Sequence, residues 1–135
     1  MNNNYPPLVA QSIEASLTAT DLVLSRNWYR DTLGFEVDRE YERDSRLIAI
    51  AMRAGPVRLL LTQDDGAKGE RRKGEGFSLQ ITTAQDIDAI AAAAKQAGAV
   101  LDTEPADMWG VRAFRLRDPD GFRWTISSPR EQTTG

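Results

Sequence analysis

Cysteine and histidine are both absent from this chain of 135 residues. Without cysteine the chain has no disulfide, no thiolate nucleophile and no cysteine metal ligand. Without histidine it lacks the commonest general base and the commonest transition-metal ligand of proteins. Chemistry based on either residue is therefore excluded.

Long apolar segments and an excess of positive charge are also missing. No apolar run approaches the roughly 20 residues that cross a bilayer, and residues 1–7, MNNNYPP, have neither the basic nor the apolar part of a signal peptide. The formal net charge of −3 and the pI near 5.0 disfavour nucleic acid as the main partner. We therefore expect a cytoplasmic protein with no membrane partner and no nucleic-acid partner.

The remaining composition is typical of one globular domain. Hydrophobic residues make up 41% and charged residues 27% of the chain, which is ordinary for a protein with a packed core. We expect a single domain at residues 12–128, with loose polar tails at 1–11 and 129–135.

An internal repeat organises the sequence. Residues 111–116 and 122–127 alternate in polarity around the turn sequence DPDG at 118–121, which predicts a β-hairpin. Residues 53–62 have a similar outline, with Arg53 matching Arg117 at an offset of 64 and Val57 matching Phe122 at 65. The sequence thus predicts two copies of one small unit.

Each copy is predicted to have the element order βαβββ. The first, residues 12–63, has strands at 13–19, 35–42, 47–53 and 57–63, and a helix from Thr20 or Asp21 to Leu33. The second, residues 77–128, has strands at 77–82, 99–103, 111–116 and 122–127, and a helix from Asp86 to Ala97. Gly34 and Gly98 should end the two helices in left-handed conformations.

Residues 64–76 are rich in glycine and charge and lack apolar periodicity, so they are predicted to be a linker. The triplet Arg71-Arg72-Lys73 is interpreted as a solvated loop rather than a phosphate site. Since neither copy is expected to bury its sheet alone, the copies should pack together within one chain or across a dimer.

Two motifs carry a resemblance to a known family. Residues 20–35, TDLVLSRNWYRDTLGF, resemble the opening motif of the vicinal oxygen chelate superfamily, which contains glyoxalase I, extradiol dioxygenases, and fosfomycin and bleomycin resistance proteins. Residues 109–112, WGVR, followed by DPDG resemble its closing motif, especially in the bleomycin-resistance-like branch. The resemblance implies an α+β fold in which two tandem βαβββ modules form curled mixed sheets with helices outside.

The metal-dependent members of this superfamily take one ligand from the first strand and one from the fourth strand of each module. By motif, the matching positions here are Glu14, Leu60, Ser78 and Thr125. Only Glu14 is a good ligand for a divalent metal, and a catalytic site needs three or four. The resemblance therefore implies a member without a metal or other cofactor.

The same layout predicts which side chains face a ligand cavity. They are Glu14, Ser16, Thr18, Ser78, Gln80 and Thr82 from the first strands, and Arg58, Leu60, Thr62, Arg123, Thr125 and Ser127 from the fourth strands. Arg58 and Arg123 occupy matching positions. They either pair with Glu14 or another acid, or bind a carboxylate, a phosphate or a flat ring.

Two further side chains complete the candidate ligand site. Trp109 follows a predicted loop at 105–108, and it forms either a wall of the cavity mouth or a seal between the modules. Arg112 either lines the groove or pairs with Asp118 or Asp120. The candidate site is therefore Glu14, Arg58, Leu60, Ser78, Gln80, Trp109, Arg112, Arg123 and Thr125.

Three functions are compatible with these features. The first is a metal-free homodimer that binds and sequesters an aromatic or anionic small molecule, such as an antibiotic. The second is a metal-independent lyase or isomerase with Glu14 as general base. The third is a protein-interaction module with a vestigial cleft. Polar inner rows favour the first two over the third, and the lack of histidine favours the first over the second.

Overall fold

The computed structural model of the protein describes residues 6–130. Residues 1–5 and 131–135 lie outside the described residues. The predictions of two polar tails and of no signal peptide fall partly on them. The elements are β1 Ala15–Ala19, α1 Leu22–Leu33, β2 Glu36–Arg43, β3 Arg46–Ala54, β4 Val57–Gln63, β5 Leu79–Thr82, α2 Ile87–Gln96, β6 Leu101–Met108, β7 Val111–Arg117 and β8 Arg123–Pro129.

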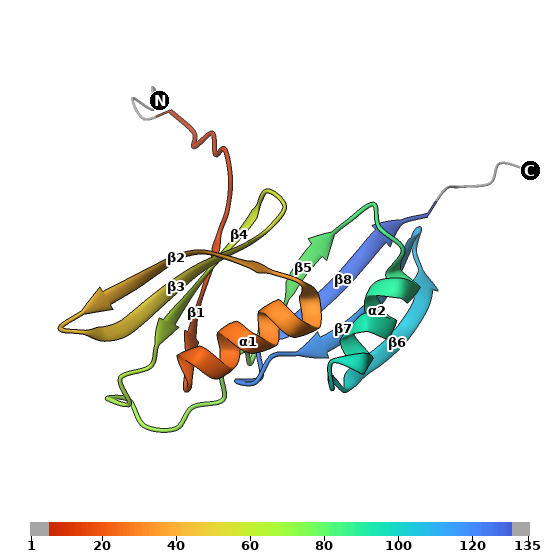
Figure 1. Cartoon of the computed structure of the whole chain (residues 1–135). Coiled ribbons are helices and arrows are strands. Elements are labelled where there is room, and N and C mark those ends of the chain that lie inside the picture. The colour runs from red at the N-terminus through yellow and green to blue at the C-terminus, as the bar shows by residue number, and fades with distance from the viewer. Residues whose placement is uncertain (1–5, 131–135) are drawn as a thin grey trace, which may run out of the picture.

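The strands form two sheets of four, with the orders β1-β4-β3-β2 and β5-β8-β7-β6 (Figure 1). In each sheet the first strand pairs in parallel with the last, and the other neighbours are antiparallel. The second sheet repeats the first in both order and direction. The predicted α+β class, two tandem βαβββ modules, is confirmed.

The helix ends follow the predicted capping residues. The Asp21 carboxylate accepts a hydrogen bond from the Leu24 amide at 3.0 Å, and the Asp86 carboxylate accepts one from the Asp88 amide at 3.0 Å. Gly34 and Gly98 follow the last turns with φ of 76° and 102°, a region that glycine enters without a steric penalty. Neither helix is long and apolar enough to span a membrane.

β4 has its predicted bounds, and most other strand ends differ from the prediction by one or two residues. β1 starts at Ala15 and β5 at Leu79, where their partners β4 and β8 provide the paired residues Leu59 and Trp124. β6 runs to Met108, so the predicted strand end at 103 and the predicted loop at 105–108 were wrong. Pro105 is tolerated there because β6 is an edge strand with two register shifts.

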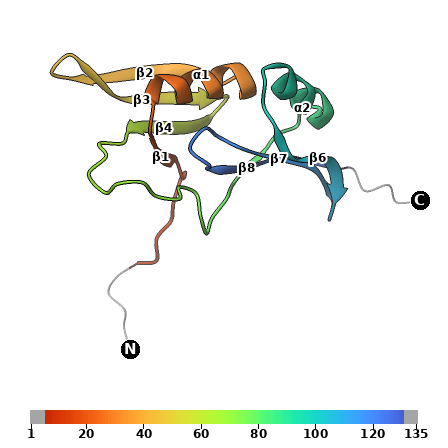
Figure 2. The ribbon, with the colours of Figure 1, turned by 90° about the horizontal axis from the view of Figure 1, so that it is seen from below.

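Both helices lie on the same side of the two sheets, and the modules meet through this helix side (Figure 2). Their buried residues form one shared core that runs from Leu17 to Ile126. Tyr29 of α1 is fully buried, and its ring makes an edge contact with Trp124 of β8 at 5.8 Å between centroids. The two modules of one chain therefore complete a common core, as expected from their incomplete individual sheets.

The opposite faces of the sheets carry exposed polar residues, among them Ser16 and Arg58 on the first sheet and Gln80 and Arg123 on the second. We call these the open faces. Because the helix sides pack together, neither open face covers the other within residues 6–130. The side chains predicted to face one ligand cavity therefore lie on two open faces that do not meet within residues 6–130.

Candidate functional site

A hollow of about 540 Å³ lies on the open face of the second sheet. It contains five of the nine predicted site residues: Ser78, Gln80, Trp109, Arg123 and Thr125. Asp102 and Met108 of β6 and Val111, Ala113 and Arg115 of β7 also line it. We call this region the sheet-2 hollow.

Three of the other predicted residues belong to the first sheet. Arg58 and Leu60 lie on the open face of β4, and Glu14 lies just before β1 begins. Within residues 6–130, Glu14 is exposed and makes no hydrogen bond or ion pair. The structure thus divides the predicted site between two sheets of the same chain.

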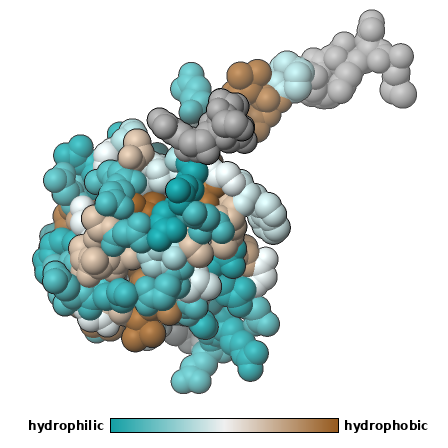
Figure 3. All heavy atoms as spheres, turned by 90° about the vertical axis from the view of Figure 1, so that its right-hand side faces the viewer, coloured by the Kyte–Doolittle hydropathy of each residue, from teal (hydrophilic) through white to brown (hydrophobic). Residues whose placement is uncertain are grey.

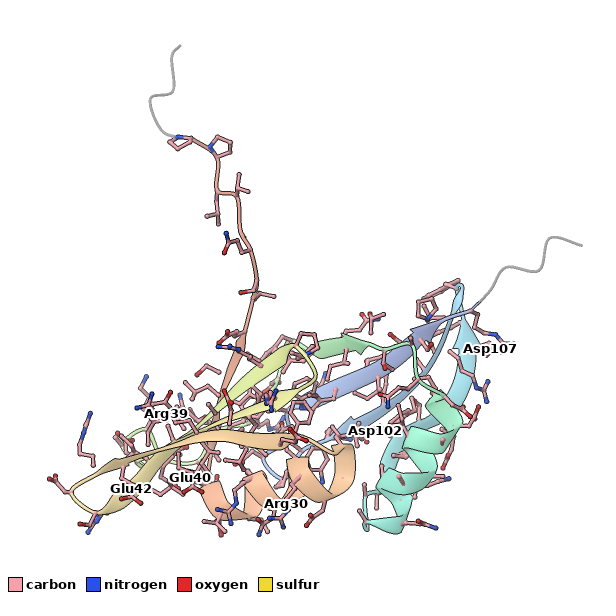
Figure 4. The ribbon with its side chains drawn as sticks, turned by 45° about the horizontal axis from the view of Figure 1, so that its top comes forward. Arg30, Arg39, Glu40, Glu42, Asp102 and Asp107 are labelled. Atoms are coloured by element: carbon pink, nitrogen blue, oxygen red, sulfur yellow. The ribbon has the colours of Figure 1, made fainter. Side chains whose placement is uncertain are left out.

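Arg112 lies outside the hollow, on the helix side of β7. Its guanidinium donates to Asp88 of α2 at 2.8 Å and to Asp107 of β6 at 2.9 Å. The predicted partners Asp118 and Asp120 were therefore wrong. The Arg112 contact holds the pKa of Asp88 below its usual range, and Arg130, followed by Arg112, does the same for the pKa of Asp107. Figure 4 shows Asp107 near the end of β6, far along the strand from Asp102.

The strand register repeats an arginine pair in both sheets. Arg53 of β3 lies opposite Arg58 of β4, and Arg117 of β7 lies opposite Arg123 of β8. Within each pair one arginine has an acidic partner. Arg53 contacts Glu36 and Asp38 at 3.3 and 3.9 Å, and the Arg117 guanidinium donates to Asp102 at 2.9 Å.

The arginine on the fourth strand of each module is the member of its pair without an acidic partner in residues 6–130. In residues 6–130, neither Arg58 nor Arg123 forms an ion pair, so the predicted pairing with Glu14 is not formed. Arg115, which lies opposite Thr125 in the sheet-2 hollow, also lacks an acidic partner in the part of the chain that is described. Two cationic side chains therefore face the same hollow with no compensating carboxylate bonded to them.

Sequence reasoning missed Arg115 because only the first and fourth strands were assigned to the cavity. The signal was present, since Phe114 and Leu116 are fully buried and Arg115 alternates with them on β7. On the first sheet the same oversight left out Tyr41 of β2, whose ring lies 4.9 Å from the Arg39 guanidinium carbon.

Trp109 forms the turn between β6 and β7 together with Gly110. Its side chain is 98% exposed, and its φ is 45°, an unusual conformation for a bulky residue. It does not seal the interface between the modules of this chain, which was one of its two predicted roles. Its indole borders the sheet-2 hollow, and its other predicted role, as a wall of the ligand cavity, stays a prediction.

Buried hydrogen bonds support the back of the hollow. The Tyr29 hydroxyl donates to Asp118 Oδ2 at 2.7 Å and accepts from Trp124 Nε1 at 2.8 Å. The other carboxylate oxygen of Asp118 accepts from the amides of Asp120 and Phe122, both at 2.9 Å. Burial raises the pKa of Asp118, while these hydrogen bonds oppose the shift.

The four positions that match the family's metal ligands do not form a metal site. Glu14 and Leu60 belong to the first module and Ser78 and Thr125 to the second, and the leucine side chain has no donor atom for a metal. Among residues 6–130, no three acidic, cysteine or histidine side chains gather closely enough to hold a metal ion. This donor set fits neither zinc nor a six-coordinate divalent ion.

The fold and the duplicated motifs together define the class of protein. Residues 12–126 match the family described as the Glyoxalase/Bleomycin resistance protein/Dioxygenase superfamily, and the chain belongs to this superfamily. No curated protein sequence matches the chain.

Solved structures share the fold at low sequence identity. A glyoxylase/bleomycin resistance protein/dioxygenase domain from Frankia sp. EAN1pec is 21% identical, with a TM-score of 0.75, covering 91% of this chain and 100% of that one. TioX from Micromonospora sp. ML1 is 17% identical (TM-score 0.70, 92% and 100% covered). UcmS2 is 16% identical, with a TM-score of 0.74, covering 89% of this chain and 98% of that one. At these identities the likeness establishes the fold alone.

Proposed function

We propose that this protein is a metal-free small-molecule binding protein, nearest the bleomycin-resistance-like branch, with one domain at residues 12–128. The sheet-2 hollow takes a planar or anionic compound, with an antibiotic as one candidate class. The observation that carries the proposal is the combination of an exposed indole, Trp109, with two arginines, Arg115 and Arg123, that lack acidic partners in residues 6–130.

Charge supports an anionic or electron-rich ligand. Asp102 in the hollow is already bonded to Arg117 at 2.9 Å, so it neutralises that arginine rather than Arg115 or Arg123. Two like charges on neighbouring strands repel each other, and a bound anion removes this repulsion. The planar guanidinium also offers two parallel donors to a carboxylate, or a flat face to an aromatic ring.

The apolar part of the hollow supports a planar ligand. Trp109, Met108 and Val111 supply hydrophobic surface beside the arginines. A ring stacked on the indole contributes about 0.5–1.5 kcal/mol beyond its area of burial. A ligand ring or a partner chain placed over the 98% exposed Trp109 side chain removes its apolar surface from water.

The enzyme hypothesis with Glu14 has less support. A general base needs a reacting group within hydrogen-bond reach and an environment that tunes its pKa. Glu14 is exposed, precedes β1, and lies on the sheet that does not contain the hollow. We therefore propose binding without catalysis.

Homodimerisation forms part of the proposal, because both open faces and the edge strands of both sheets are uncovered in the chain described. Unpaired edges and exposed faces invite a second copy. By contrast, the surface beyond α2 and β6 is mostly hydrophilic, with hydrophobic residues only in scattered patches (Figure 3). The open faces are thus the better candidates for the dimer contact.

The test is a screen of aromatic acids and antibiotics by tryptophan fluorescence and thermal shift. Arg123→Leu should weaken a charged hit about tenfold or more, because a charge-assisted contact is lost, while the melting temperature of the free protein changes little. Arg46→Leu, an exposed arginine on the first sheet, is the control and should bind as wild type does. If no compound binds, or if hits bind Arg123→Leu equally well, the protein-interaction hypothesis replaces this one.

A further inference from the structure

The linker is anchored to the turn between β7 and β8. Gly74 is buried there, and a Cβ on it would lie 2.7 Å from the Gly121 carbonyl oxygen and 2.8 Å from the Phe122 Cα. The Lys73 ammonium is also buried and contacts Asp64 at 2.8 Å and Asp120 at 3.3 Å. The interpretation of residues 71–73 as a solvated loop was therefore wrong for Lys73.

This anchoring brings a basic part of the linker to the basic end of the second sheet. Arg71 and Arg72 line a hollow of about 390 Å³ together with Arg117 and Arg123. Two segments separated by more than forty residues in the sequence thus contribute arginines to one place. We call this hollow the linker corner.

The charges of the linker corner are not balanced by its acids. Asp120 is engaged by Lys73, and Arg117 is engaged by Asp102. Within residues 6–130, Arg71, Arg72 and Arg123 form no ion pair, and Glu75 is the remaining acid that lines the hollow. A local surplus of cations in a chain of net charge −3 is not a consequence of overall composition.

We propose that the linker corner binds the phosphate group of a small molecule. A phosphate carries close to two negative charges and has several acceptor oxygens, so it can satisfy guanidinium groups that approach from different segments. A carboxylate carries one charge in one plane and leaves the remaining arginines unpaired. Lys73 holds the linker in place, and the arginines contact the ligand.

The linker corner adjoins the sheet-2 hollow through Arg123, which lines both. The proposal rests on the proposed function through this one residue: the phosphate would extend from a body bound in the sheet-2 hollow. Arg71 and Arg72 do not line the sheet-2 hollow. Substituting these two residues therefore tests the phosphate site without altering the surface assigned to the planar ligand.

The experiment is calorimetric titration with pyrophosphate at constant ionic strength. The variant R71A/R72A should bind pyrophosphate at least about tenfold more weakly than wild type, since two charge-assisted contacts are lost. The control R43A/R46A loses the same charge at the turn between β2 and β3, where both residues are exposed. It should bind as wild type does, and melting temperatures should establish that all three proteins are folded.

Three results would overturn the phosphate site: no binding of pyrophosphate by wild type, equal binding by R71A/R72A, or equal weakening in R43A/R46A, which would indicate a general effect of net charge. The planar ligand is tested separately by the fluorescence screen on R71A/R72A. Retained binding of an uncharged aromatic hit with lost pyrophosphate binding supports both sites. Retained pyrophosphate binding with no aromatic hit on wild type overturns the proposed function alone.

Discussion

The Tyr29 hydroxyl joins the two modules through hydrogen bonds that water does not reach. It donates to Asp118 on the second module and accepts from the Trp124 indole, and none of the buried side-chain polar atoms in residues 6–130 lacks a partner. The sequence does not reveal these hydrogen bonds, because the partners of Tyr29 lie 89 and 95 residues away from it.

Tyr29→Phe should destabilise the protein by about 2–4 kcal/mol, because it leaves a buried indole N–H and a buried carboxylate oxygen each short of a partner. Urea unfolding followed by fluorescence measures this loss. Tyr41→Phe, at an exposed tyrosine of β2, is the control and should change stability by less than about 0.5 kcal/mol. Equal effects of the two substitutions would show that the buried bonds contribute nothing beyond the ring.

The buried Tyr29 hydroxyl should also make the protein less stable toward unfolding at alkaline pH. Burial, followed by the Asp118 carboxylate, raises its pKa above the ordinary 10.0, so the folded state keeps a proton that the unfolded state releases. Its contribution is complete below pH 10 and declines as the pH rises, by about 1.4 kcal/mol per pH unit. Urea midpoints from about pH 9 to about pH 11 should fall more steeply for wild type than for Tyr29→Phe. Parallel slopes would contradict the assignment.

Among the elements, local sequence signals were sufficient to predict the bounds of the two helices, but they were insufficient to predict the bounds of the edge strand β6. Capping residues and glycines defined both helices to within a residue or two. β6 was underpredicted because Asp, Glu and Pro are poor strand formers, and only its pairing with β7 overrides that preference. The linker was located from composition, but its anchoring depends on a close backbone contact that composition does not reveal.

Because of that contact, Gly74 is the linker glycine that should tolerate substitution least. Gly74→Ala should cost about 2–3 kcal/mol, because the new methyl group would overlap the backbone of Gly121 and Phe122 in addition to the strain of φ at 80°. Gly76→Ala is a matched control, since Gly76 has φ of 88° and open space around it. Denaturant unfolding of both variants separates the overlap from the strain. If both variants lose the same stability, the backbone at Gly74 moves away from Gly121 and Phe122 at no measurable cost, and the close contact does not fix the linker.

For the whole molecule, the sequence predicted two equal modules but not how they meet. The repeat offset and the family resemblance both point to paired sheets, and they leave open whether the pairing lies within a chain or between chains. The structure shows the helix sides packed together and the open faces uncovered. The nine predicted site residues are consequently split between sheets, five in the hollow of the second. The sequence does not reveal the packing between the modules, nor, for the proposed dimer, the contact between chains.

The proposed homodimer leads to the last prediction. Light scattering at micromolar concentration should give twice the 15.0 kDa of one chain. Leu60→Asp places a charge on the open face of the first sheet, between Ser16 and Ala51 on the neighbouring strands. If a partner covers that face, burying this charge costs several kcal/mol, and the dimer should dissociate about a hundredfold more readily. Val100→Asp, at a side chain that is 85% exposed before β6, should leave the mass unchanged. A wild-type mass of one chain would refute the dimer, and a Leu60→Asp dimer as tight as wild type would move its interface away from the first sheet.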